Sequence, residues 1–364
     1  MIGRNQILRA CLFSAALAFT AGTAGKAMAS DPLPGDSIAP PVNVNIGLLY
    51  NQFNDAGALG ALRGSNYAHD THISTDIAVL RYIRTFEIKG VEAGVQVYEP
   101  YVAFLGQQKI GLSNTEPSPF GAGTANLSHS SGFGQPNFGA FFWPVNDPKT
   151  GTYVVVAPWI SPPISGYNNS SFLTPGNNTW VYEMEIGART TLIGTPTTPN
   201  LQVEAWGEVY GFGDNNKSAA NSPAVSANNI PFPASLFFKN PIAQASSTPA
   251  TFHEQPSEEF RIYFPYNFAP AMGAFIAPGF YQSFGGKQTY TIHANGAKVD
   301  SGNRTEESQL RLIASTFVNP STQIMLVGGY DIANHGGPLN RSFEIRIGPS
   351  WSDNFNYITC VLAN

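Results

Sequence analysis

The chain has 364 residues, of which 12% are charged, 12% are aromatic and 43% are hydrophobic, and its formal net charge is −5. The charged fraction is about half of the quarter that soluble domains usually have. No basic patch or run of Lys and Arg is present, so a nucleic-acid partner is not expected.

The first 29 residues have the pattern of a secretory signal peptide. Arg4 and Arg9 precede an apolar run, and Ala27-Met28-Ala29 then gives a small-x-small cleavage pattern. Cleavage leaves a mature chain from Ser30 and takes the basic residues from 19 to 16 against 24 acidic ones, a net charge of about −8. An uncleaved anchor helix is the alternative, which the short run and the cleavage pattern disfavour.

The mature chain lacks two features of common exported proteins. Only Cys360 remains after cleavage, so an internal disulfide is not expected. No later apolar run reaches the roughly 18 residues that a membrane helix needs. Two architectures fit such a chain: a large soluble β-sandwich, or a β-barrel in an outer membrane.

A period of two, typical of β-strands, recurs along the chain. In residues 180–193 one face carries Trp180, Tyr182, Met184 and Ile186, and the other carries Glu183, Glu185 and Arg189. The same pattern, with turn residues between the segments, predicts twelve strands. Their expected ranges are 43–51, 75–86, 91–103, 133–143, 152–160, 180–193, 201–212, 258–266, 273–283, 306–318, 322–332 and 341–351.

The connections between these strands alternate in length. Short ones lie at Lys89-Gly90, Asp147-Pro148, Pro196 to Pro199, Pro270 and Pro320. The long ones are 52–74, 104–132, 161–179, 213–257, 284–305 and 333–340. Short periplasmic turns and long extracellular loops are typical of outer-membrane barrels, whereas a Greek-key sandwich scatters its long connections. We therefore predict an all-β fold, a single antiparallel up-and-down transmembrane barrel of about 12 strands over residues 43–351.

Charges at strand centres are nearly all Glu or Arg, and Lys is almost confined to turns and loops. A confined interior favours Arg, whose planar fork binds several carboxylates, so the charged face is interpreted as the lumen. Arg81 and Arg84 have opposite parity, which places one of them at an interface or beyond a bulge. Twelve residues are predicted to line the lumen as a transport path: Glu92, Gln96, Glu183, Glu185, Arg189, Glu204, Glu208, Glu259, Arg261, Arg311, Glu344 and Arg346.

Aromatic residues gather at the expected periplasmic strand ends, where amphipathic rings favour the headgroup level. This membrane girdle is predicted to include Phe86, Phe141, Phe142, Trp143, Phe264, Tyr266, Phe268, Phe317 and Trp351. The alternative is that these rings form the core of a soluble sandwich.

Residues 131–215 also resemble a known family. The shared elements are Gly132-x-Gly134, a Pro-containing strand exit before Gly166-Tyr167, Asn178-x-Trp180, Glu185-x-Gly187 and Asp214-Asn215. They resemble the outer-membrane protein family named for the meta-pathway of phenol degradation, specifically over these residues and loosely elsewhere. The resemblance implies one outer-membrane β-barrel, described as a transporter for aromatic or other hydrophobic compounds, without catalytic residues.

The C-terminus departs from that family's pattern. Such barrels commonly end on an aromatic residue that the barrel-assembly machinery recognises, but this chain continues past Trp351. Residues 352–364 are therefore either a short tail or part of a shifted last strand that includes Phe355 and Tyr357.

Catalytic and metal sites are weaker interpretations. Glu183 and Glu185 would lie about 6.5–7 Å apart on one strand face, near the spacing of paired glycosidase carboxylates. An ion-pair ladder with Arg189 and the other interior arginines explains them better. All six His fall in predicted connections, and the cluster of His69, Asp70 and His72 is better explained as solvated than as a metal site. No cofactor and no catalytic residue are expected.

The predicted function is passive transport of small, hydrophobic or aromatic compounds through a narrow lumen in the outer membrane of a Gram-negative bacterium. Membrane lipid, the assembly machinery and the solute are the expected partners. The alternatives are a non-conducting barrel for binding, adhesion or structure, and, less favoured, a barrel enzyme. The Pro-rich segment 30–42 is expected on the periplasmic side, as a tail or a partial plug, and the apolar loop segment 230–238 is a candidate entry site.

Overall fold

A computed structural model describes residues 31–60, 67–112, 123–171, 173–176, 178–195, 197–219, 249–300 and 304–352. The predicted signal peptide, the loop segment 230–238 and the tail after residue 352 lie outside these residues. In the described part of the chain, no helix combines the length and the apolar character needed to cross a membrane.

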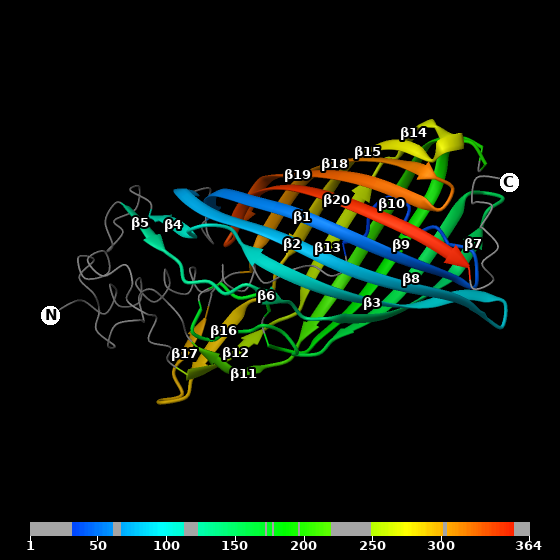
Figure 1. The fold of residues 1–364 in the computed structure, drawn as a ribbon. Coiled ribbons are helices and arrows are strands. Elements are labelled where there is room, and N and C mark those ends of the chain that lie inside the picture. The colour runs from blue at the N-terminus through cyan, green and yellow to red at the C-terminus, as the bar shows by residue number, and fades with distance from the viewer. Residues whose placement is uncertain are drawn as a thin grey trace.

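Twelve long strands form one closed antiparallel barrel, which confirms the predicted fold class (Figure 1). Each strand pairs with its neighbours in chain order, and the first and last strands close the cylinder, with Val44 opposite Ser352. Both ends of the barrel chain therefore lie at the same rim. The strands are β1 (Val44–Gly60), β2 (Tyr67–Ile88), β3 (Val91–Phe104), β7 (Asn137–Asp147), β8 (Thr152–Ser161), β9 (Val181–Gly194), β10 (Pro199–Phe212), β13 (Ser257–Tyr263), β15 (Ala274–Phe284), β18 (Glu306–Asn319), β19 (Thr322–His335) and β20 (Pro338–Ser352).

The short turns have the chemistry that tight hairpins need. Lys89 and Gly90 join β2 to β3 with positive φ angles of 51° and 82°, as a two-residue type I′ turn requires. Between β13 and β15 the chain forms the short strand β14 (Tyr266–Ala269) and the single 3-10 turn η1 (Pro270–Met272). Pro265 lies at the break after β13, where a residue without an N–H cannot continue the ladder.

At the opposite rim, the long connections are more structured than predicted. The predicted connection 52–74 is largely strand, because β1 continues to Gly60 and β2 begins at Tyr67. Connections 213–257 and 284–305 contribute to one four-stranded sheet, visible at one end of the barrel in Figure 1. That sheet consists of β11 (Asn215–Ala219), β12 (Pro249–Glu254), β16 (Gln288–Ile292) and β17 (Lys298–Asp300). The short strands β4 (Lys109–Leu112), β5 (Gly123–Asn126) and β6 (Gly132–Phe133) extend the barrel sheet instead.

Placing all histidines in loops was therefore wrong. His69 and His72 lie on β2 and His335 ends β19. His72 Nδ1 lies 3.5 Å from the Asp55 carboxylate on the neighbouring strand.

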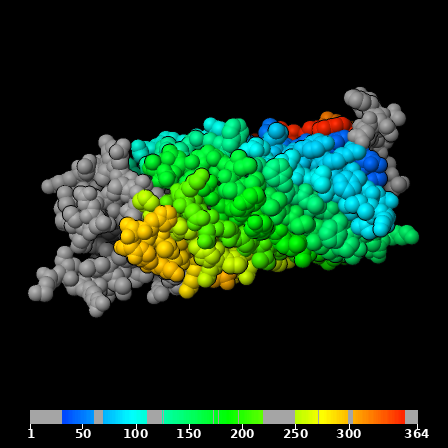
Figure 2. All heavy atoms as spheres, turned by 90° about the horizontal axis from the view of Figure 1, so that it is seen from below, coloured from blue at the N-terminus to red at the C-terminus, as the bar shows by residue number. Residues whose placement is uncertain are grey.

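The outer wall of the barrel is apolar. Large side chains that would be buried in a soluble protein are exposed here, among them Leu80 at 63% and Ile186 at 50%. An apolar band around a closed barrel is the lipid-facing surface of an outer-membrane protein. Figure 2 shows one side of this wall as a continuous surface.

The predicted aromatic girdle is correct only in part. Phe264, Tyr266, Phe268 and Trp351 are exposed on the outer wall at the periplasmic rim. Phe141 and Trp143, however, are 6% and 5% exposed and point into the barrel, where their rings meet edge to face. Phe141 and Trp143 have odd numbers on β7 and exposed Phe142 has an even one, so strand alternation already placed them on the face opposite to Phe142.

The outer wall gives a first prediction. Ile186→Arg places a charge near the middle of the lipid-facing side of β9 and is expected to lower the free energy of unfolding by about 2–4 kcal/mol. Leu192→Arg, near the periplasmic end of the same strand, is expected to cost about 0–1 kcal/mol. Urea unfolding in lipid vesicles measures both variants. Equal costs at the two positions would contradict the assigned depth of β9.

Candidate functional site in the barrel lumen

All twelve residues predicted to line the lumen lie on the inner face of the barrel. Eleven of them are buried or nearly so. Glu92 lies at the periplasmic rim, where its carboxylate accepts a 3.1 Å hydrogen bond from Asn146. Of the two arginines with opposite parity, Arg81 is the interior one and is 9% exposed.

A segment before the first strand occupies the middle of the lumen. We call residues 31–41 the plug. Its Leu33 is fully buried, and Asp36 N–H donates to the Leu33 carbonyl at 3.0 Å, which closes a turn. Of the two alternatives for this segment, a periplasmic tail and a partial plug, the contacts fit the plug, because charged groups of the lumen bind these residues inside the barrel.

The first plug anchor is Asp31. Its carboxylate lies 2.9 Å from Arg261 Nε on β13 and 2.6 Å from Arg311 Nη1 on β18. Arg261 is fully buried and also binds Glu208 on β10 and, at 2.8 Å, Glu259 on its own strand. One guanidinium therefore joins the plug to two barrel strands.

The second plug anchor is Asp36, on the other side of the lumen. Arg346 Nη1 lies 2.9 Å from its carboxylate, and Arg81 Nη1 lies 3.8 Å away. These two arginines also lie over aromatic faces, Arg346 at 4.2 Å from the Tyr50 ring centroid and Arg81 at 4.5 Å from that of Tyr98. Stacking and ion pairing together fix the guanidinium planes.

The plug backbone provides a third anchor. Glu204 on β10 accepts hydrogen bonds from the N–H groups of Gly35 at 2.8 Å and Ser37 at 3.3 Å. Trp143 Nε1 donates to the Ser37 carbonyl at 2.8 Å. This bond explains why the Trp143 ring faces the lumen instead of the membrane.

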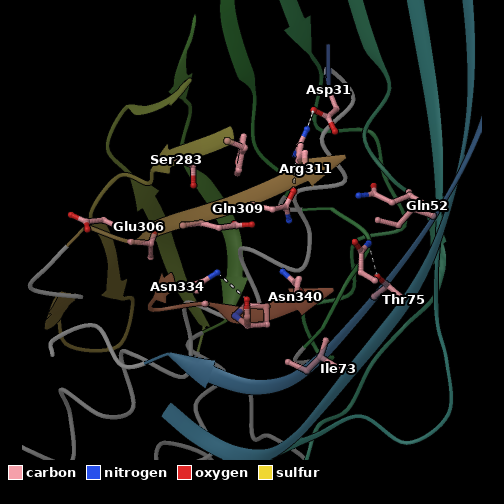
Figure 3. A pocket seen from close by; sticks show the side chains of 17 residues that line it. Asp31, Gln52, Ile73, Thr75, Ser283, Glu306, Gln309, Arg311, Asn334 and Asn340 are labelled. Carbon is pink, nitrogen blue, oxygen red and sulfur yellow. Dashed lines mark hydrogen bonds and ion pairs between the residues drawn. The ribbon is translucent and has the colours of Figure 1, made fainter. Parts of the chain in front are cut away.

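The plug lies between two cavities. The outer one, about 130 Å³, has Asp31 and Arg311 on its wall together with polar residues of the extracellular half, such as Gln309 and Asn340 (Figure 3). The inner one, about 500 Å³, opens among the periplasmic turns and has Ile38 to Pro41 of the plug on its wall. Its wall combines apolar and aromatic side chains, including Ile46, Phe141, Tyr153, Phe275 and Phe317, with polar and charged ones. The polar and charged ones include Asp36, Arg81, Gln96, Glu185, Arg189, Gln202, Asn267 and Gln323.

Several lumen rings lie flat over glycines of the next strand. Trp206 on β10 is directly opposite Gly187 on β9, and Trp159 on β8 is opposite Gly139 on β7. A Cβ at Gly187 would lie 2.4 Å from the Trp206 ring, and one at Gly139 would lie 2.3 Å from the Trp159 ring. Only glycine lets these rings rest against the wall and leave the chamber open.

This arrangement predicts that Gly187→Val pushes the Trp206 ring into the inner chamber. We expect a loss of about 1–3 kcal/mol in stability from overpacking, and a narrower chamber. Gly207→Val is the control, since a Cβ there meets nothing within 4 Å. Thermal unfolding with tryptophan fluorescence detects the difference, and equal stability of the two variants would refute the stacking explanation.

The partner of Arg189 is not the one that the sequence suggested. Arg189 binds Glu204 at 3.3 Å and Gln202, both on β10. The carboxylate oxygens of Glu183, Glu185 and Glu208 instead lie within 4.8 Å of one another. This is closer than the roughly 6.5–7 Å that straight-strand geometry predicts for Glu183 and Glu185.

The sequence suggested a partial plug but did not identify the residues that anchor it. Asp31 and Asp36 lie in a Pro-rich stretch without periodicity. The one indication in the sequence was that their carboxylates could pair with the arginines predicted inside the barrel. Interior tyrosines were also missed, although parity places them beside charged residues: Tyr210 donates to Glu208 at 2.5 Å, and Arg311 donates to the Tyr263 hydroxyl oxygen at 3.1 Å.

Comparisons with known proteins identify the family. A family model described as "Putative MetA-pathway of phenol degradation" matches residues 51–347. The chain belongs to this family. The matched residues run from β1 to β20, so they include nearly all of the barrel and of the strands that enclose the lumen. No curated protein sequence matches the chain.

Three solved structures are similar to this chain over most of its length. An outer membrane channel from Pseudomonas putida F1 has 18% identity and a TM-score of 0.66, over 88% of this chain and 100% of that chain. The transport unit of the Escherichia coli autotransporter AIDA-I has 7% identity and a TM-score of 0.46, over 93% and 98% of the two chains. The Pseudomonas putida toluene transporter TodX has 9% identity and a TM-score of 0.41, over 92% and 96%.

Proposed function

We propose that the protein is an outer-membrane channel through which small hydrophobic or aromatic compounds diffuse passively. The observation that carries the proposal is the inner chamber of about 500 Å³, walled by aromatic and aliphatic side chains with a few charged groups. A cavity of about 150 Å³ already accommodates benzene, so the chamber has room for a single-ring compound. Sites for small molecules typically have such an apolar wall with few polar groups.

The family and the fold support this proposal. The family description refers to phenol degradation, and the Pseudomonas putida barrel with the TM-score of 0.66 is named an outer membrane channel. The twelve lumen residues are proposed to line the path, with Arg261, Arg311 and Arg346 holding the plug across it. A solute then reaches the chamber when the plug shifts from the wall.

Uptake by intact cells tests the proposal. Cells that produce the protein are expected to accumulate radiolabelled phenol faster than cells with an empty vector. Ile46→Trp, which places a larger ring in the inner chamber, is expected to lower uptake, whereas Leu49→Trp on the lipid-facing side of the same strand is expected to leave it unchanged.

One structural observation favours a second candidate, a barrel that binds solutes without conducting them. The plug crosses the lumen between the two cavities and is held by at least three anchors. A sealed binding barrel predicts saturable quenching of tryptophan fluorescence by phenol without any increase in uptake. Phenol uptake that depends on the protein and is lowered by Ile46→Trp but not by Leu49→Trp decides for the channel.

A further inference from the structure

Four carboxylates lie side by side on the inner wall of three adjacent strands. Glu185 on β9 is directly opposite Glu208 on β10, and Glu208 is directly opposite Glu259 on β13. Glu183 follows on the same face of β9. Like charges directly opposite each other on neighbouring strands repel, so this row needs compensation.

Protein cations compensate only part of this charge. Arg261 binds Glu208 and Glu259 but is shared with Asp31 of the plug. Glu185 is 6% exposed, and within the described residues it has no hydrogen bond and no ion pair within 4.0 Å. Burying an ionised carboxylate without a partner is costly, so Glu185 faces an unfilled requirement for positive charge.

The geometry of the cluster suits a metal ion. One carboxylate oxygen from each of Glu183, Glu185 and Glu208 lies within 4.8 Å of the other two. Ligand oxygens about 2.3–2.6 Å from a central Ca²⁺ are separated by at most about 5 Å, so the spacing of these three is compatible with one shared ion. Glu208 already accepts bonds from Arg261 and Tyr210, but each carboxylate oxygen has a second lone pair.

We propose that Glu183, Glu185 and Glu208 bind a divalent hard cation, Ca²⁺, in the wall of the lumen. The donor set is three carboxylates with no His or Cys, which suits Ca²⁺ rather than Zn²⁺ or Cu²⁺. The ion reaches the site from the periplasmic side, because Glu185 also lines the inner chamber. This site does not depend on which solute the barrel transports.

Terbium luminescence tests the proposal on the full-length protein in detergent. Tb³⁺ replaces Ca²⁺ at oxygen sites, and Trp159 is positioned to sensitise it because it is directly opposite Glu183 on the next strand and faces the lumen. We expect a saturable Tb³⁺ emission that excess Ca²⁺ displaces. Measuring Ca²⁺ bound after equilibrium dialysis gives a second readout that does not require energy transfer.

Matched variants complete the experiment. Glu185→Gln breaks no bond within the described residues and is expected to weaken binding at least about tenfold, and E183Q/E185Q is expected to abolish it. Glu344→Gln is the control, an interior carboxylate on β20 that lies 3.6 Å from Arg346, outside the cluster. Absence of saturable Tb³⁺ and Ca²⁺ binding to the wild-type protein, or equal binding by E183Q/E185Q, would overturn the proposal.

Discussion

Replacing Arg261 with Met is expected to lower the free energy of unfolding by about 3–5 kcal/mol, the usual cost of removing one partner from a buried ion pair. Arg261 is fully buried and holds three carboxylates, those of Asp31, Glu208 and Glu259. Without the guanidinium, these groups remain buried together with no shared cation. Urea unfolding in lipid vesicles measures the loss.

The control for this variant is an exposed ion pair near the extracellular end. Arg304 lies 3.7 Å from Glu258, and the two side chains are 44% and 55% exposed. Arg304→Met is expected to cost no more than about 1 kcal/mol. In R261M/E208Q/E259Q, where two of the three carboxylates are neutral, stability is expected to recover in part. A cost for R261M no larger than that for R304M would show that Arg261 does not hold the lumen together.

Neutralising both plug aspartates is expected to open the lumen. D31N/D36N removes the charge that attracts Arg261 and Arg311 at one anchor, and Arg346 and Arg81 at the other. The loss of two charge pairs whose aspartates are 17% and 21% exposed is expected to weaken plug docking by about 2–5 kcal/mol. Each loss of about 1.4 kcal/mol in the free energy of plug docking raises the ratio of open to closed barrels about tenfold, so open barrels become far more common.

Asp55→Asn is the matched control for the plug variant. Asp55 lies on β1 and is 53% exposed, and it contacts His72 instead of the plug. Cleavage of the plug by an added protease, followed by mass spectrometry, is expected to be faster in D31N/D36N than in the wild type and in D55N. Equal rates in all three proteins would mean that the two aspartates do not hold the plug in place.

The barrel itself was predictable because its determinants are local. Residues 180–193 largely alternate between apolar and polar side chains, and so do several other strands, since lipid lies on one side and the lumen on the other. Short turns such as Lys89-Gly90 have recognisable chemistry. All twelve barrel strands were therefore found, and their ends were missed mainly where β1 and β2 continue beyond the apolar band, because alternation there no longer separates apolar from polar residues.

The arrangement inside the lumen was less predictable because its determinants are distant in sequence. Asp31 and Arg311 are separated by 280 positions, and no local pattern links a Pro-rich stretch to a strand near the end of the chain. Parity placed Glu183, Glu185 and Arg189 on the correct face. It did not reveal that Arg189 binds Glu204 on the neighbouring strand, or that the Glu185 carboxylate lies beside those of Glu183 and Glu208.

The central claim is that the barrel conducts when the plug moves, and single-channel recording in planar lipid bilayers tests it most directly. We predict discrete conductance steps for the wild-type protein and a larger or more persistent open level for D31N/D36N, with D55N like the wild type. Absence of steps in both the wild type and D31N/D36N, from protein that shows the heat-modifiable gel migration of a folded barrel, would contradict a channel.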